Sequence, residues 1–204
     1  YYNMLTHGGY LYVIKSDTIA VAKLGTNGSV GAWQTISGSN AGGTPYDSRG
    51  ARVAVAQGRL YMVGGGWSGG SESLTVAYAT LNGDGTLGGW AYATDLPDEF
   101  VYGGLHSYGN ALYAYTNSGV VYRGVIGTGG NITSWQAANF SVPGGDPYGV
   151  AVELDPATGY VYFAGLGTGG STAAYSRKMG GTTDIVGSLS VSAGLAVSTS
   201  PVAL

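Results

Sequence analysis

The stretch Leu60-Tyr61-Met62 returns in variant form three more times along this chain. The other versions are Leu11-Tyr12-Val13, Leu112-Tyr113-Ala114 and Val161-Tyr162-Phe163, so that the four begin 49, 52 and 49 residues apart. Aliphatic, β-branched and aromatic residues of this kind are typical of a strand. A period close to 50 residues predicts four copies of one repeat, and such a repeat decides the fold class before any single residue does.

A turn followed by tryptophan fixes the register of the repeats. The three clear examples are Asn27-Gly28 before Trp33, Asp84-Gly85 before Trp90 and Gly129-Gly130 before Trp135. Dipeptides of this type accept the positive φ angles of a tight hairpin, so each turn is expected to join two antiparallel strands. We expect the three tryptophans to occupy equivalent positions and to be largely buried between neighbouring sheets. The fourth copy has Ser188 near the position of the tryptophan, as a degenerate terminal repeat would.

Each period divides into four short strands. In the second copy the alternation and the β-branched and aromatic residues predict strands at 52–56, 60–63, 74–81 and 90–94. Four strands per repeat without helical periodicity are typical of one blade of a β-propeller. The chain is therefore predicted to be a single all-β propeller domain, residues 1–204, with blades at about 1–36, 50–94, 103–138 and 149–191 and a tail at 192–204.

The repeat resembles that of the kelch family. The resemblance rests on Leu60-Tyr61-Met62-Val63-Gly64-Gly65 and on Trp90, and the double glycine is missing from the other three copies. It implies the β-propeller architecture of the galactose oxidase and kelch superfamily, with no specific member indicated. Four blades either close into a small ring or form part of a larger one, and the larger ring is built by two chains or by a longer chain.

Composition restricts the class of protein. The 204 residues include 39 Gly and 17 Tyr, only 9% are charged, and the net charge is −3. With eight Lys and Arg in total, no basic track for nucleic acid is expected. No run approaches the roughly 18 apolar residues that cross a membrane, so no membrane insertion is expected. The composition is unusual for a cytosolic protein, and an extracellular or cell-surface location is expected.

No set of residues in the sequence indicates a particular catalytic reaction. Galactose oxidase needs a cysteine cross-linked to tyrosine together with copper-binding histidines, whereas this chain has no Cys and only two histidines, His7 and His106, in different repeats. The segment 84–90 resembles a sialidase box, but its Asp-to-Trp spacing is wrong. No catalytic residue, metal site or cofactor is therefore predicted. One alternative is calcium bound by the acids expected in the longer loops, namely Asp47, Asp95, Asp98, Glu99 and Asp146.

Tyrosines recur just ahead of the first strand of each repeat. These are Tyr2, Tyr46, Tyr102 and Tyr148. Aromatic rings beside carboxylates suit sugars, because rings stack on C–H faces while acids accept from hydroxyl groups. The predicted ligand-binding residues are Tyr46, Asp47, Arg52, Trp67, Tyr102 and Tyr148. The alternative is that the tyrosines only pack loops, and that the acids gather there because long loops are polar.

The sequence thus predicts a non-catalytic recognition or assembly module that binds a glycan or a surface protein, with self-association open. The alternatives are a carbohydrate-active enzyme of kelch-like class and a structural subunit of a surface fibre. Three sequons would allow glycan attachment in a secreted protein, at Asn27, Asn131 and Asn139.

Overall fold

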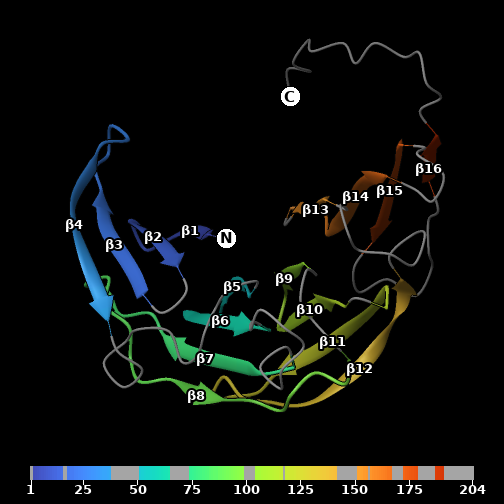
Figure 1. The fold of residues 1–204 in the computed structure, drawn as a ribbon, viewed down its shortest axis with the longest axis horizontal. Helices are drawn as coiled ribbons and strands as arrows, with labels where there is room; N and C mark the ends of the chain where they lie inside the picture. The colour runs from blue at the N-terminus through green and yellow to red at the C-terminus, as the bar shows by residue number, and fades with distance from the viewer. Residues whose placement is uncertain are drawn as a thin grey trace. The chain divides into compact units, whose positions relative to one another are not determined.

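A computed structural model shows a chain of β-strands joined by turns (Figure 1). It describes residues 2–15, 18–37, 51–64, 74–98, 104–116, 118–141, 151–155, 157–166, 172–178 and 187–190. Within these residues there is no helix, and the strands form four antiparallel sheets. Each sheet consists of four strands that are consecutive in the sequence. The predicted all-β class and the division into four repeats of four strands are confirmed.

The first two sheets follow the first two sequence repeats. Sheet 1 contains β1 (Tyr2–His7), β2 (Tyr10–Lys15), β3 (Thr18–Leu24) and β4 (Val30–Ser37). Sheet 2 contains β5 (Arg52–Ala56), β6 (Arg59–Val63), β7 (Val76–Thr80) and β8 (Ala91–Tyr92). The strand predicted at 52–56 has the predicted bounds, whereas the fourth strand, predicted at 90–94, is shorter.

The last two sheets repeat the same order. Sheet 3 contains β9 (Leu105–Tyr108), β10 (Ala111–Tyr115), β11 (Val120–Ile126) and β12 (Ile132–Ser141). Sheet 4 contains β13 (Ala151–Asp155), β14 (Tyr160–Leu166), β15 (Thr172–Lys178) and β16 (Gly187–Ser190). The chain divides into two compact units, residues 1–148 with sheets 1 to 3 and residues 149–204 with sheet 4.

The turns between third and fourth strands have the predicted conformation. Gly28, Gly85 and Gly130 have φ angles of 80°, 86° and 88°. A residue with a Cβ atom adopts such angles only with strain, so glycine is required at these three places. The hairpins at the ends of β3, β7 and β11 are therefore confirmed.

Each sheet has two faces, because successive strand residues point to opposite sides. We call one side the tyrosine face, and in the four sheets it carries Tyr12, Tyr61, Tyr113 and Tyr162. We call the other side the leucine face, and it carries Leu11, Leu60, Leu112 and Val161. The strand registers support this equivalence, since Leu5, Ala54, His106 and Glu153 lie opposite the four tyrosines in turn.

In the first unit, the tyrosine face of one sheet packs against the leucine face of the next sheet at two places. The tyrosine face of sheet 1 and the leucine face of sheet 2 share one hydrophobic core, which includes Tyr12, Ile14, Ile19, Leu60, Met62 and Leu87. The tyrosine face of sheet 2 and the leucine face of sheet 3 share the other, which includes Tyr61, Val63, Val76, Leu105, Leu112 and Ile132. The first strands β1, β5 and β9 lie on the inner side of this unit and β4, β8 and β12 on the outer side (Figure 1).

The tryptophans show where this packing stops. Trp90 packs against the first core and Trp135 against the second, both partly buried. The indole N–H of Trp135 also donates a 2.8 Å hydrogen bond to the carbonyl oxygen of Thr94, in sheet 2. Trp33 is 49% exposed, so the expectation that all three are largely buried is wrong for this residue. The reason is that, among the described residues of the first unit, no sheet packs on the leucine face of sheet 1.

Candidate functional site

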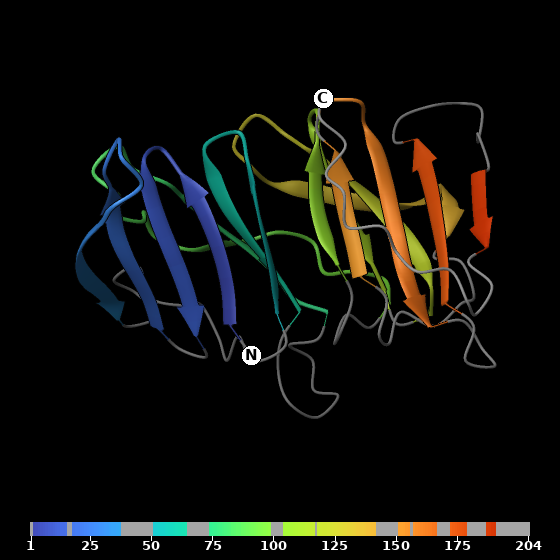
Figure 2. The same cartoon turned by 90° about the horizontal axis from the view of Figure 1, so that it is seen from above.

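The sheets of the first unit present two ends (Figure 2). The hairpin end carries the turns from first to second strand and from third to fourth strand. The link end is the opposite one, where each first strand begins and each second strand ends. The predicted ligand-binding residues belong to the link end by their sequence positions. We therefore examine the described part of this end as the candidate site.

Asp98 joins two of the segments that meet at the link end. It precedes β9, and its Oδ2 atom accepts a 3.0 Å hydrogen bond from the hydroxyl of Thr116, just after β10. The hydroxyl of Ser118 donates to the same oxygen. Thr116 is fully buried, and its single hydroxyl proton is shared between Asp98 and the carbonyl oxygen of Val120, which lies 2.9 Å from the hydroxyl oxygen. The segment between two sheets is thus tied to the loop between second and third strands.

A second polar contact joins two sheets. The Nδ2 atom of Asn3, on β1, donates a 2.8 Å hydrogen bond to the carbonyl oxygen of Ala51. The Nη1 atom of Arg52, the first residue of β5, lies 3.4 Å from the same oxygen. Ala51 is fully buried, whereas Arg52 is half-buried. A carboxamide and a guanidinium, both rich in N–H donors, are thereby brought together at the start of two inner strands.

Of the predicted ligand-binding set, the structure describes only Arg52. The others, Tyr46, Asp47, Trp67, Tyr102 and Tyr148, lie outside the described residues. The same holds for Glu99 and Asp146 of the calcium alternative. Of the remaining acids of this alternative, Asp98 accepts hydrogen bonds from Thr116 and Ser118, and Asp95 is exposed. The sites Asn27 and Asn131 are exposed, and the side chain of Asn139 is outside the description.

Sequence reasoning missed Asn3, Thr116 and Ser118. Asn3 lies opposite Ile14 on β2 and Arg52 lies opposite Val63 on β6, so the two occupy the same position of the repeat. A polar residue at this position in both copies was a signal that alignment of the repeats could have found. Thr116 and Ser118 gave no such signal, because short hydroxyl side chains are common in loops.

Among the described residues, the carboxylates with a perturbed pKa belong to turns. At the hairpin end, hydrogen bonds from Thr86 hold the pKa of Asp84 below its usual value. In the turn after β13, hydrogen bonds from Thr158 and from the backbone of Ala157 do the same for Asp155. Asp84 is exposed and Asp155 is partly buried, and both accept hydrogen bonds from residues two or three positions ahead, which is a common turn-stabilising arrangement.

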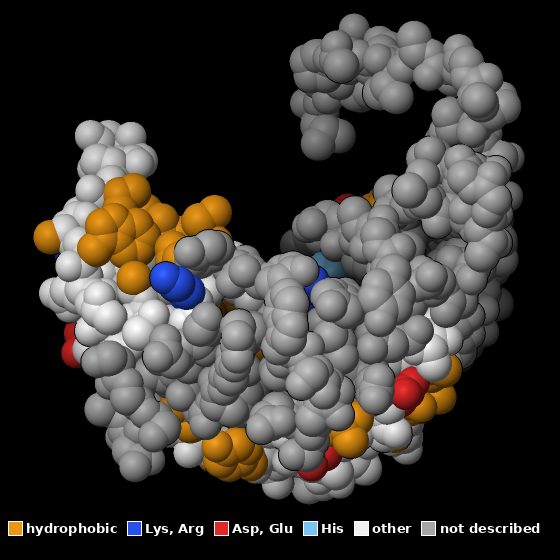
Figure 3. Space-filling model, viewed as in Figure 1, with side chains coloured by type: hydrophobic (Ala, Val, Ile, Leu, Met, Phe, Trp, Pro, Cys, Tyr) orange, Lys and Arg blue, Asp and Glu red, His pale blue; other side chains and the backbone are white. Residues whose placement is uncertain are grey.

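The described residues contain no group of three or more His, Asp or Glu side chains placed to hold a metal ion. In the same part of the chain, no helix has the length and apolar character to cross a membrane. Figure 3 shows the described charged side chains as separate spots on this face of the molecule. The chemistry available at the described link end is thus hydrogen bonding by hydroxyl, carboxamide, guanidinium and carboxylate groups.

No protein-family model matches this chain, and no curated protein matches it. Among solved structures, YjhT is similar over 95% of this chain and 65% of its own, with a TM-score of 0.64 and 15% identity. A candidate 6-phosphogluconolactonase from Bacteroides uniformis ATCC 8492 is similar over 92% of this chain and 56% of its own, with a TM-score of 0.54 and 14% identity. These likenesses concern the fold alone. The chain spans less than two thirds of the length of either structure.

Proposed function

We propose that this chain is a kelch-like β-propeller module that recognises a glycan or an exposed protein segment at its link end, without catalysis. The observation that carries the proposal is the meeting of Asn3 and Arg52 at the carbonyl of Ala51. It brings donor groups from two sheets to the end of the chain where Tyr46 and Asp47 also belong by sequence.

The propeller is supported by the repeated packing of the sheets. A propeller is a radial series of four-stranded sheets in which each sheet packs on the next in the same way. Sheets 1 to 3 follow this rule, with the tyrosine face of one sheet against the leucine face of the next. The kelch resemblance adds the expectation of a longer ring than three or four blades.

A neutral or weakly basic ligand fits the composition. Only 9% of residues are charged and the net charge is −3, so strong charge pairing is not the basis of recognition. Tyrosine and tryptophan give flat apolar surfaces, and the amide, guanidinium and acid groups exchange hydrogen bonds with hydroxyl groups. The extracellular or cell-surface location is supported by the exposed sequon positions Asn27 and Asn131, which leave room for a glycan.

A glycan array followed by calorimetry tests this proposal. We expect the wild-type chain to bind, and the double variant Tyr102→Ala with Tyr148→Ala to bind about 10- to 100-fold more weakly, at an unchanged melting temperature. The matched control is Tyr92→Ala, which removes an exposed ring from β8, at the edge of sheet 2 opposite the first strand β5. Equal affinities for wild type and double variant, or turnover of the bound sugar, would contradict the proposal.

A further inference from the structure

Two Asn-Gly pairs lie in equivalent hairpins of the first unit. Asn27-Gly28 is in the turn between β3 and β4, and Asn82-Gly83 is in the turn between β7 and β8. In such a pair the backbone nitrogen of the glycine can attack the side-chain carbonyl carbon of the asparagine, because glycine has no Cβ atom to hinder the approach. The local sequence alone therefore marks both pairs for the same reaction.

The turn of sheet 1 restrains both reacting groups of its pair. The N–H of Gly28 donates a 3.0 Å hydrogen bond to the carbonyl oxygen of Gly25, and this bond closes the turn. The side chain of Asn27 is held as well, because its Oδ1 atom accepts a 3.1 Å hydrogen bond from the N–H of Ser29. Attack at Asn27 therefore requires that two hydrogen bonds open.

The pair in sheet 2 occupies an earlier position of the same turn. Here the closing hydrogen bond runs from the N–H of Gly85 to the carbonyl oxygen of Asn82 at 3.0 Å, so Gly83 lies inside the turn. Among the described residues, the N–H of Gly83 donates no hydrogen bond. The Nδ2 atom of Asn82 donates to the hydroxyl of Thr86 at 2.9 Å, and both residues of the pair are exposed. The attacking nitrogen is thus available at Asn82.

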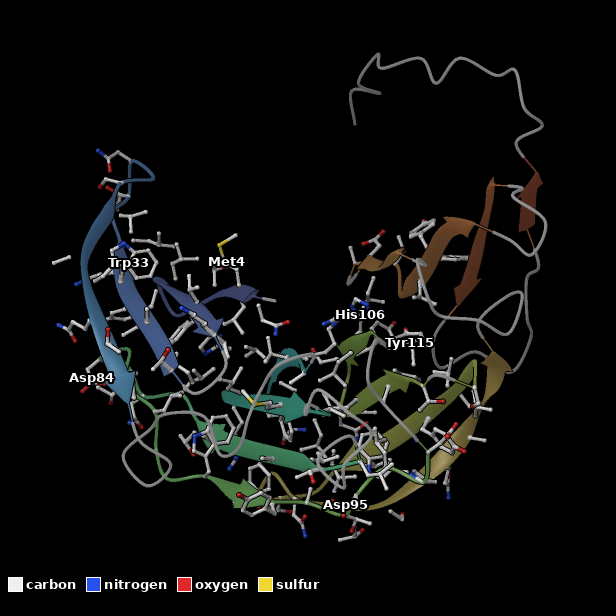
Figure 4. The ribbon with its side chains drawn as sticks, in the orientation of Figure 1. Met4, Trp33, Asp84, Asp95, His106 and Tyr115 are labelled. Carbon is white, nitrogen blue, oxygen red and sulfur yellow. The ribbon has the colours of Figure 1, made fainter. Side chains whose placement is uncertain are left out.

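The neighbouring Asp84-Gly85 pair is protected from the same reaction. The N–H of Gly85 is engaged in the closing hydrogen bond of the turn. Hydrogen bonds from Thr86 hold the pKa of Asp84 below its usual value, which keeps the carboxylate ionised and a poor target for attack. Figure 4 labels Asp84, which lies two residues beyond Asn82 in this turn. The turn thus distinguishes Asn82 from both other pairs.

We propose that Asn82 is a site of spontaneous deamidation, whereas Asn27 is protected by its turn. The nitrogen of Gly83 loses its proton to water and bonds to the Cγ atom of Asn82, the Cγ–Nδ2 bond breaks, and the amide leaves as ammonia with a proton from water. Water then opens the resulting five-membered imide. Opening at Cγ gives aspartate, and opening at the main-chain carbonyl gives isoaspartate, in which the chain continues through the former side chain.

Isoaspartate at position 82 disrupts the turn and the contact that the turn makes. Its main chain is longer by one carbon atom, so it does not keep both the 2.9 Å bond from the N–H of Asn82 to the carbonyl oxygen of Thr86 and the bond from Gly85. Gly85 lies so close under the ring of Tyr10 in sheet 1 that an added Cβ atom would come within 2.6 Å of it. The modification therefore weakens the packing of sheet 1 on sheet 2.

Peptide mapping by mass during incubation in mildly alkaline buffer tests the site. The chain is made in cells that attach no glycan to Asn27. We expect Asn82 in the folded chain to convert about fivefold faster than Asn27 or more, the ratio expected when one further ordinary hydrogen bond must open. In guanidinium chloride the two pairs should convert at similar rates. Equal rates in the folded chain, or a difference that persists in guanidinium chloride, would overturn the proposal.

Two substitutions test the chemistry and its structural consequence. Gly83→Ala places a methyl group where nothing lies within 4 Å, so it should slow the conversion of Asn82 without lowering the melting temperature. Asn82→Asp has the charge of the product without the longer main chain, and should unfold at a higher urea concentration than the isoaspartate form isolated from aged wild type. Unchanged conversion in Gly83→Ala, or an isoaspartate form as stable as Asn82→Asp, would overturn the proposal.

Discussion

The hydroxyl of Tyr61 donates a 2.7 Å hydrogen bond to the carbonyl oxygen of Gly130, which is 69 residues further along the chain. The bond is buried and joins the tyrosine face of sheet 2 to a turn of sheet 3. Tyr12 has the same position in sheet 1. Burial raises its pKa, and the negative charge of Asp84, in the corresponding turn of sheet 2, raises it further. Within residues 1–148, the tyrosine of the repeat thus connects sheet 2 to the hairpin of sheet 3 and brings sheet 1 close to the hairpin of sheet 2.

The buried hydroxyl of Tyr61 predicts a loss of stability at high pH. Burial raises the pKa of Tyr61 from 10.0 to about 12. A raised pKa in the folded state means that folding favours the neutral hydroxyl, so its contribution is complete below the unfolded value of 10. It should be lost as pH rises from about 10 to about 12. Urea unfolding of wild type and Tyr61→Phe across this range should show the variant losing less stability, and parallel curves would contradict the prediction.

Two glycines with similar backbone conformations allow the cost of backbone strain to be distinguished from the cost of a steric clash between sheets. Gly28 and Gly85 have φ angles of 80° and 86°, but only Gly85 lies under a ring, that of Tyr10. Gly28→Ala should therefore cost about 1 kcal/mol of unfolding free energy, the strain alone. Gly85→Ala should cost about 1 to 3 kcal/mol more, because the new methyl group meets the ring. Urea denaturation at low protein concentration measures both, and equal losses would show that the sheets do not pack as described.

The tryptophans give a second matched comparison. Trp135→Ala removes a ring from the core between sheets 2 and 3 together with its hydrogen bond to Thr94, and should cost about 3 kcal/mol or more. Trp33→Ala removes a ring that is already 49% exposed and should cost clearly less. Thermal unfolding of dilute samples distinguishes them. A Trp33→Ala loss as large as that of Trp135→Ala would mean that sheet 1 is covered within the single chain.

The hydrogen bonds from Thr116 and Ser118 to Asp98 predict which substitution destabilises the link end. Thr116→Val keeps the shape of a fully buried side chain but removes the donor to Asp98 and to the carbonyl of Val120. It should lower the unfolding free energy by about 0.5 to 1.5 kcal/mol, because a part-buried hydrogen bond is lost while Asp98 keeps the hydroxyl of Ser118 and the Val120 carbonyl keeps the backbone N–H of Thr116. Ser118→Ala, at an exposed position, should cost less. Amide hydrogen exchange should also speed up around Asp98 in the first variant, and unchanged exchange there would contradict the prediction.

The repeat and its turns could be predicted from sequence because their causes are local. Strand composition around Leu60-Tyr61-Met62 and the need for glycine at positions 28, 85 and 130 are both properties of short segments. The exposure of Trp33 could not be predicted in this way, since its local sequence resembles that of Trp90 and Trp135. Burial of each tryptophan depends on whether another sheet covers it, which is a property of the assembled molecule.

The candidate site was predicted less completely than the fold. Arg52 was among the predicted residues, and the structure joins it to Asn3, which the sequence had not singled out. Contacts between sheets depend on pairs of residues far apart in the sequence, here 48 positions for Asn3 and Ala51. The aromatic residues proposed to complete the site, among them Tyr102 and Tyr148, stay predictions.

Hydrogen exchange of the chain with and without its bound glycan tests the proposed function most directly. Peptides that contain the link end, with Arg52 and Tyr102, should exchange more slowly in the complex, and peptides that contain the hairpin turns at Gly85 and Gly130 should not change. Slower exchange at the hairpin turns with no change at the link end would contradict the account, because the recognition surface would then lie at the opposite end of the sheets.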